Sequence, residues 1–212
     1  MDRRSLVIVV VIGSELLFRL AYATFLLPAG PPFDTDAMKL LYTAAARVAQ
    51  CAAIILLALD LCGLKTESPR NEALAGIGVS LAFGTAVLLS DLAVRPFFPG
   101  GWLSLLLSKQ TMAEPMLFFL VGCVLGPFAE ELFFRGTLYA WLRERMPPAA
   151  AIVLSSLLFA GLHPGFAVQL VGGLLFASLF EWRKSIWAGF IVHAAANFGI
   201  WLIPWIIDIG PR

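Results

Sequence analysis

Long, uninterrupted apolar runs are the feature of this sequence that most restricts its fold. An α-helix needs roughly 17–25 residues to cross a bilayer. Hydrophobic residues make up 60% of the 212-residue chain, more than the core of a soluble domain of this size can bury. We therefore predict an all-α, polytopic transmembrane helix bundle of about seven spans, namely Leu6–Leu27, Ala37–Leu64, Ala73–Val94, Met112–Leu142, Ala149–His163, Phe166–Trp182 and Ile186–Ile207.

Two features of the spans qualify this count. Met112–Leu142 is too long for one straight span and contains Gly126-Pro127, so a division there would give eight spans. Glu15 and Arg19 interrupt the first run, which favours an uncleaved helix over a signal peptide. Seven spans of about 20 residues occupy roughly 140 positions, which leaves short connectors and no room for a soluble domain.

The charge balance indicates what surrounds the chain. The formal net charge is +1, so no basic face is available for a nucleic acid, and none is expected as a partner. Membrane lipid is expected instead, in the plasma or inner membrane of a prokaryote. Cytoplasmic loops of membrane proteins are enriched in Lys and Arg. A cytoplasmic amino terminus places most basic residues on the inner side: Arg3, Arg4, Lys65, Arg70, Arg143, Arg145, Arg183 and Lys184.

Charged residues at membrane depth are costly, so each needs a partner or a function. Glu15 with Arg19, and Asp91 with Arg95, are spaced i,i+4 and can neutralise each other on one helical face. We interpret these pairs as structural. The three cysteines, Cys51, Cys62 and Cys123, have no metal-ligand or redox spacing and are interpreted as small buried residues.

A second group of polar residues is denser and points to chemistry. Glu130 and Glu131 are adjacent, and Arg135 can pair with Glu131 at i,i+4, which leaves Glu130 without a partner in its own helix. The only two histidines, His163 and His193, lie in other apolar runs. Asn197 shares a helical face with His193, among small residues that allow close helix packing.

These residues can meet at one depth. At 1.5 Å per residue, Glu130, His163, His193 and Asn197 lie about 12–22 Å from the inner-side basic residues or turns. That range is the middle of a hydrocarbon core roughly 30 Å thick. We therefore predict that the four side chains line one cavity, where Glu130 and His163 share a water molecule. We also expect Phe134 and Phe159 to wall it, and Gly161, Gly189 and Ala196 to mark close helix contacts.

In these motifs the chain resembles the CAAX-protease and bacteriocin-processing (CPBP, or Abi) family of intramembrane proteases, which is distantly similar to the Ras-converting CAAX endopeptidase. The family pattern is Glu-Glu-x-x-x-Arg, Phe-x-x-x-His and His-x-x-x-Asn on successive membrane helices. Here the three motifs are Glu130-Glu131-x-x-x-Arg135, Phe159-x-x-x-His163 and His193-x-x-x-Asn197, in that order. We expect residues 112–212 to form the catalytic core and residues 1–111 to be amino-terminal helices of subfamily-specific sequence.

The resemblance implies that Glu130 and His163 activate a water molecule, while His193 and Asn197 stabilise the tetrahedral oxyanion. Glu131, Arg135 and Phe159 are then supporting residues. A zinc site formed by Glu130, His163 and His193 is the alternative, because two His and one Glu are a known catalytic ligand set. We favour a glutamate mechanism without metal, since using Glu130 as a ligand would remove the obvious base.

The expected function is therefore that of an intramembrane endopeptidase that cleaves a membrane-tethered protein or peptide tail. A small proton-coupled transporter or channel would also use intramembrane Glu, His and Arg. A non-catalytic immunity protein is a third reading. Transport predicts polar residues strewn along a pathway, whereas here they cluster in three motifs at one depth, which favours proteolysis.

Overall fold

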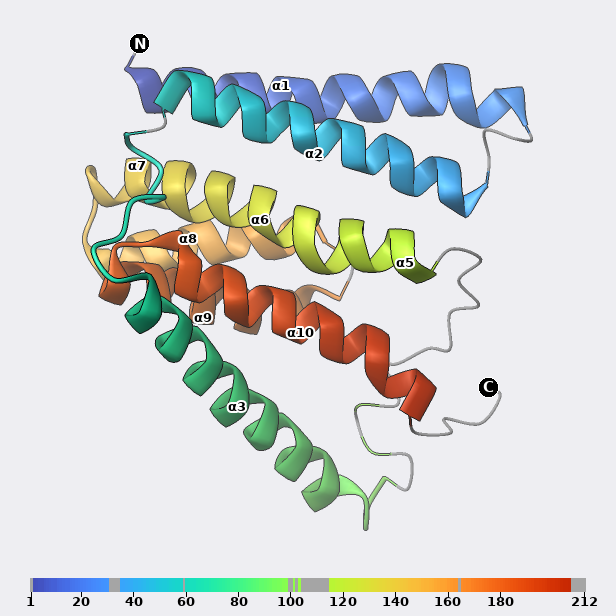
Figure 1. The fold of residues 1–212 in the computed structure, drawn as a ribbon, viewed down its shortest axis with the longest axis vertical. Coiled ribbons are helices and arrows are strands. Elements are labelled where there is room, and N and C mark those ends of the chain that lie inside the picture. The colour runs from blue at the N-terminus through green and yellow to red at the C-terminus, as the bar shows by residue number, and fades with distance from the viewer. Residues whose placement is uncertain are drawn as a thin grey trace.

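The computed structural model describes residues 2–30, 35–58, 60–98, 101, 103, 115–163 and 165–206, without the side chains of residues 204 and 205. The described part of the chain forms seven helices (Figure 1), six of which are long and apolar enough to cross a membrane. The predicted all-helical, multi-span architecture of an integral membrane protein is confirmed at this level. Residues 112–114, at the start of the fourth predicted span, lie outside the described residues.

The amino-terminal part contains three long helices. Helix α1 (Arg3–Ala21) continues through a π-helical segment, η1 (Tyr22–Leu26), and a 3₁₀ turn, η2 (Leu27–Ala29). Helix α2 spans Asp36–Ala58 and α3 spans Pro69–Val94. The carboxyl-terminal part holds one long helix made of five segments, α5 (Pro115–Phe118), η3 (Phe119–Leu125), α6 (Gly126–Glu130), η4 (Glu131–Tyr139) and α7 (Ala140–Arg143), followed by α8 (Pro148–Gly161), α9 (Phe166–Arg183) and α10 (Ile186–Ile206).

Local sequence explains where the first and third helices begin. The Asp2 side chain accepts a hydrogen bond from the Ser5 backbone N–H at 2.8 Å and so caps α1. Ser68 caps α3 in the same way, and Pro69 follows it in the first helical turn, where a missing N–H costs nothing. Helix α2 ends at Ala58, earlier than the predicted Leu64. In the connection that follows, Gly63 adopts a φ of +69°, a left-handed conformation that favours glycine.

The long helix from Pro115 to Arg143 is continuous across Gly126-Pro127, so the predicted division into two spans does not occur. Instead, the backbone widens into π-helical turns on both sides, η3 before Gly126 and η4 after Glu130. Such turns absorb the disturbance that a proline makes in the helical hydrogen-bond ladder, and they are frequent at functional sites. The bundle therefore has one long, irregular central helix.

Helix α8 is shorter than the predicted span Ala149–His163. It has 14 residues and ends at Gly161, a length of about 21 Å that does not cross a 30 Å core. The sequence explains why α8 ends early. A proline disfavours the helical conformation of the residue before it, and here Pro164 follows His163. Helices α8 and α9 pack against each other (Figure 1), and His163 follows the end of α8 at the tip of this helical hairpin.

One end of the bundle gathers the charged residues. Ion pairs there join the amino end of α1 to the connection after α2 and to the end of α7, and they join the carboxyl end of α9 to the amino end of α3. These pairs are Arg3–Asp60 at 2.7 Å, Arg145–Asp2 at 2.9 Å, Arg183–Glu72 at 2.7 Å and Arg4–Glu144. Four of the basic residues predicted on one side of the membrane, Arg3, Arg4, Arg145 and Arg183, therefore lie at one end of the structure.

Candidate active site

Glu130 is the residue on which the candidate site centres. It is the last residue of α6, and 16% of its side chain is exposed. Its Oε1 lies 3.6 Å from His163 Nε2, and its Oε2 lies 3.7 Å from His193 Nε2. The long central helix, the α8–α9 hairpin and α10 thus bring one carboxylate and both imidazoles of the chain together, as the depth argument predicted.

The His163 ring is held by its own helix. His163 Nδ1 lies 2.7 Å from the backbone oxygen of Phe159, one turn earlier. Because a carbonyl oxygen only accepts, Nδ1 carries the proton, and in the neutral ring Nε2 is an acceptor. Nε2 is the nitrogen that faces Glu130. A water molecule within hydrogen-bond distance of both Nε2 and the Glu130 carboxylate fits this 3.6 Å separation.

The His193 ring is held by a carboxylate instead. Its Nδ1 lies 3.1 Å from Glu131 Oε1, and the same oxygen lies 3.2 Å from Arg135 Nη1. Glu131 and Arg135 are 0% and 1% exposed, so this chain of three groups is buried. The predicted Glu131–Arg135 pair is confirmed. The pair has a second contact that spacing did not predict, because Glu131 also orients His193.

Asn197 lies one helical turn beyond His193 on α10. Its Nδ2 donates a hydrogen bond of 2.8 Å to the backbone oxygen of Gly122 in η3. This carbonyl belongs to a π-helical segment, where the regular backbone pairing is altered. A carboxamide has two N–H donors, so the contact with Gly122 fixes the side chain and leaves its second N–H for another acceptor.

Aromatic rings surround the polar groups. Phe159 is fully buried, and its ring lies 4.4 Å from the His163 ring and 5.1 Å from the Phe134 ring, centroid to centroid. Phe176 of α9 stacks on His193 with centroids 4.6 Å apart and an interplanar angle of 18°. The Arg135 guanidinium lies over the Phe159 ring at 4.6 Å. The expectation that Phe134 and Phe159 wall the site agrees with these contacts.

Some contacts of the site lie outside the three motifs and were missed. Phe176 is one of 17 phenylalanines, and nothing local distinguishes it. The Gly173 carbonyl, which accepts from Arg135 Nη2 at 3.4 Å, was missed because any backbone offers one. Close packing at Gly189 is confirmed, since a Cβ there would lie 3.0 Å from Glu131 Oε2. The same prediction for Gly161 is wrong: open space surrounds it at the end of the short α8.

Charged residues in the amino-terminal helices also have partners. The predicted i,i+4 pairs are present, with 2.7 Å between Arg19 Nε and Glu15 Oε1 and 3.0 Å between Arg95 Nη2 and Asp91 Oδ2. Arg47 contacts Glu15 Oε2 at 3.0 Å.

The arrangement of the described residues can be compared with the one that a metal ion needs. Within the described residues, no group of three or more His, Cys, Asp or Glu side chains has an arrangement that could hold a metal ion. Glu130, His163 and His193 approach one another, but each histidine contacts a different carboxylate oxygen of Glu130. The catalytic roles of the site residues and the choice between glutamate and zinc chemistry stay predictions.

Comparison with known proteins bears on the same part of the chain. Residues 111–199 match a family model described as Rce1-like, Type II CAAX prenyl endopeptidase Rce1-like. The matched segment contains all three motifs and every residue of the candidate site. No curated protein and no solved structure matches the chain significantly.

Proposed function

We propose that this chain, whose residues 111–199 form an Rce1-like CAAX prenyl endopeptidase family domain, is an intramembrane endopeptidase that uses Glu130 as its base. The observation that carries the proposal is the approach of one carboxylate, only 16% exposed, to two imidazoles from separate helical segments, at 3.6 and 3.7 Å. The family match favours a peptidase over a transporter, because the matched family is one of endopeptidases.

The proposed reaction begins with a water molecule between Glu130 and His163. The Glu130 carboxylate takes a proton from the water as the oxygen attacks the peptide carbonyl, and His163 Nε2 orients the water. Because His163 Nδ1 is held by the Phe159 carbonyl, Nε2 keeps its direction throughout. The oxyanion then re-forms the carbonyl as the C–N bond breaks, and Glu130 passes its proton to the leaving amine, so that the carboxylate is regenerated.

Charge on the tetrahedral oxyanion is stabilised by donors on α10. His193 Nδ1 lies against the Glu131 carboxylate, which fixes the ring so that it presents Nε2 to the site, and Nε2 is a donor when it carries a proton. The second N–H of Asn197 is the other donor. Preorganised donors in a site that excludes bulk water stabilise developing charge more strongly than donors in water do. Phe159 and Phe176 provide such surroundings through their ring contacts with the histidines.

We also propose a membrane orientation with the amino terminus in the cytoplasm. The ion-paired end of the bundle, with Arg3, Arg145 and Arg183, is then the inner face. Six long helices cross the membrane, and α8 enters from the inner face and ends at mid-depth, where His163 meets Glu130. The substrate class is a membrane-tethered protein or peptide tail.

The direct test is cleavage by purified wild type and Glu130→Gln in proteoliposomes. One probe is an internally quenched peptide ending in a farnesylated CAAX sequence, and the other carries an unprenylated apolar tail. We expect wild type to cleave at least one, and Glu130→Gln to lose roughly 10²-fold or more in rate while remaining folded. His163→Ala and His193→Ala should lose similar amounts. Glu67→Gln, the same change at an exposed position, is the matched control.

The outcomes separate the parts of the proposal. Full activity of Glu130→Gln would refute the glutamate mechanism. If wild type cleaves only the farnesylated peptide, the substrate class is that of prenylated tails, and the enzyme recognises the prenyl group. If it cleaves neither probe, a tethered tail of these two kinds is not the substrate.

A further inference from the structure

Two neighbouring cavities lie at the end of the bundle that gathers the charged residues. One has a volume of about 410 Å³, and its wall carries four basic and three acidic side chains. The other has a volume of about 730 Å³, and five of its eight lining residues are apolar: Leu64, Pro69, Ala73, Trp187 and Ile191. Leu64 and Lys65 line both cavities, so a charged space adjoins an apolar one.

The carboxylates in the charged wall already have partners. Each forms ion pairs with basic residues, which are Arg3 for Asp60, Arg4 and Arg145 for Glu144, and Arg143 and Lys184 for Glu181. Lys65 differs from these cations, because its exposed side chain forms no ion pair within the described part of the chain. The nearest acidic residues in the sequence do not neutralise it: Glu72 is bound by Arg183 at 2.7 Å, and Glu67 lines neither cavity. Lys65 therefore offers a positive charge where the two cavities meet.

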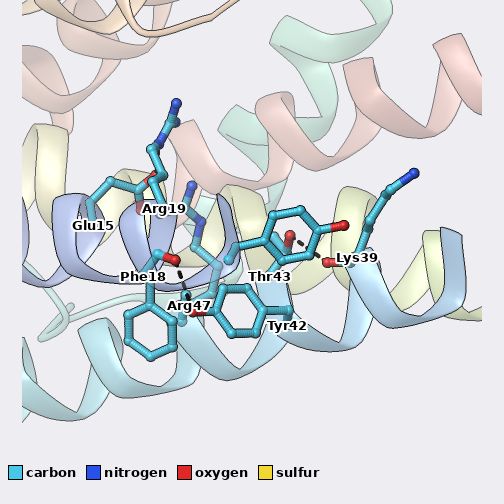
Figure 2. A pocket seen from close by; sticks show the side chains of 9 residues that line it. Glu15, Phe18, Arg19, Lys39, Tyr42, Thr43 and Arg47 are labelled. Carbon is cyan, nitrogen blue, oxygen red and sulfur yellow. Dashed lines mark hydrogen bonds and ion pairs between the residues drawn. The ribbon is translucent and has the colours of Figure 1, made fainter. Parts of the chain in front are cut away.

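A third cavity, between α1 and α2, does not offer such a charge. Figure 2 shows its basic side chains, Arg19, Lys39 and Arg47, together with Glu15. Arg19 and Arg47 share Glu15, and Lys39 contacts Asp36 at 3.6 Å. Each of these cations has a carboxylate partner, so this cavity carries no comparable argument for a bound anion.

The apolar cavity has a fixed wall at the edge of the membrane. The Trp187 indole N–H donates a hydrogen bond of 2.8 Å to the backbone oxygen of Leu64, which ties α10 to the connection between α2 and α3. Ile191, one turn further along α10, and Ala73, in the second turn of α3, line the same space. Tryptophan is enriched at membrane–water interfaces, where its ring meets hydrocarbon and its N–H meets polar groups. The cavity thus lies where acyl chains meet headgroups.

We propose that the two cavities together bind one anionic phospholipid. Its phosphate lies beside Lys65, and one acyl chain occupies the apolar cavity against Ala73, Trp187 and Ile191. A free anion would leave the apolar space unfilled, and an uncharged apolar ligand would leave Lys65 without a partner. Basic pockets between transmembrane helices are known to hold anionic headgroups. This site is separate from the proposed peptidase function, and its test does not depend on finding a substrate.

The test uses phospholipids with brominated acyl chains, which quench tryptophan fluorescence on contact. The full chain in detergent micelles is titrated with brominated phosphatidylglycerol or brominated phosphatidylcholine. The part of the quenching that disappears in Trp187→Phe reports on the apolar cavity. We expect phosphatidylglycerol to quench Trp187 at a lower concentration than phosphatidylcholine. Lys65→Gln should weaken phosphatidylglycerol binding about fivefold, and Ala73→Phe, which fills the apolar cavity, should weaken it at least as much.

Two control variants match these changes. Arg70→Gln removes the same charge from an exposed residue of α3 that lines neither cavity. Leu74→Phe enlarges the residue after Ala73, which is 58% exposed and also lies outside both walls. Both controls should bind phosphatidylglycerol as wild type does. Lys65→Gln breaks no ion pair, so its unfolding temperature without lipid should equal that of wild type.

Four results would overturn the proposal. The first is equal quenching of Trp187 by the two lipids in wild type. The second is unchanged phosphatidylglycerol binding by Lys65→Gln or by Ala73→Phe. The third is full protection of Trp187 from quenching by inorganic phosphate, which would make this a site for free anions. The fourth is displacement of the lipid by a water-soluble acidic peptide, which would make the surface a site for a protein partner.

Discussion

The buried Glu131–Arg135 pair allows a quantitative prediction for Glu131→Gln. Both side chains are at most 1% exposed, and 3.2 Å separates Arg135 Nη1 from Glu131 Oε1. Removing one partner of a buried ion pair typically costs about 3–5 kcal/mol, because the other charge stays buried without compensation. Arg135 keeps the Gly173 carbonyl and the Phe159 ring at 4.6 Å. We therefore expect the lower end of that range, about 3 kcal/mol.

The assay is reversible unfolding in mixed micelles, followed by the fluorescence of the six tryptophans. Adding Arg135→Met to Glu131→Gln should recover most of the loss, since removing both charges leaves neither one buried alone. The double-mutant cycle then gives the coupling energy of the pair. Glu144→Gln is the control: its carboxylate is 52% exposed and contacts Arg4 and Arg145. Exposed pairs contribute at most about 1 kcal/mol.

An unfolding free energy of Glu131→Gln within about 1 kcal/mol of wild type would refute the buried-pair reasoning. The same preparations serve in the cleavage assay. Normal stability combined with lost cleavage would show that Glu131 acts on the reaction through His193, which it contacts at 3.1 Å.

Two further predictions concern packing and metal. Gly136→Ala should destabilise the protein by about 1–3 kcal/mol in the same unfolding assay, because the new Cβ would clash with the Cys62 carbonyl oxygen. Gly78 has open space around it, so the control Gly78→Ala should be neutral or stabilising. Equal effects of the two substitutions would contradict the clash. If Glu130 is the base, treatment with a strong zinc chelator should leave cleavage intact, and metal analysis should find less than one zinc per chain. Inhibition by the chelator that added zinc reverses would instead assign Glu130, His163 and His193 as zinc ligands.

Much of the architecture could be predicted because bilayer insertion depends on local hydropathy. Six of the predicted runs correspond to long helices, and the i,i+4 rule identified Glu131–Arg135, Glu15–Arg19 and Asp91–Arg95 correctly. These relations lie within one helix, where helical geometry sets the neighbours. The order of the three motifs was similarly readable, and it led to the family that residues 111–199 match.

Only the tertiary structure decided how the helices meet. Hydropathy alone does not show that α8 ends after 14 residues, at Gly161, or that His163 beyond its end lies beside Glu130. Nor does residue spacing indicate that Phe176 stacks on His193 or that the Gly122 carbonyl holds Asn197, because each contact joins two different helices. The requirement for glycine at position 136 is likewise set by tertiary packing, because the Cys62 backbone lies against the place that a Cβ would occupy. Apolar helices pack in many registers of similar hydropathy, and the register is selected by shape and by the pairing of buried polar groups.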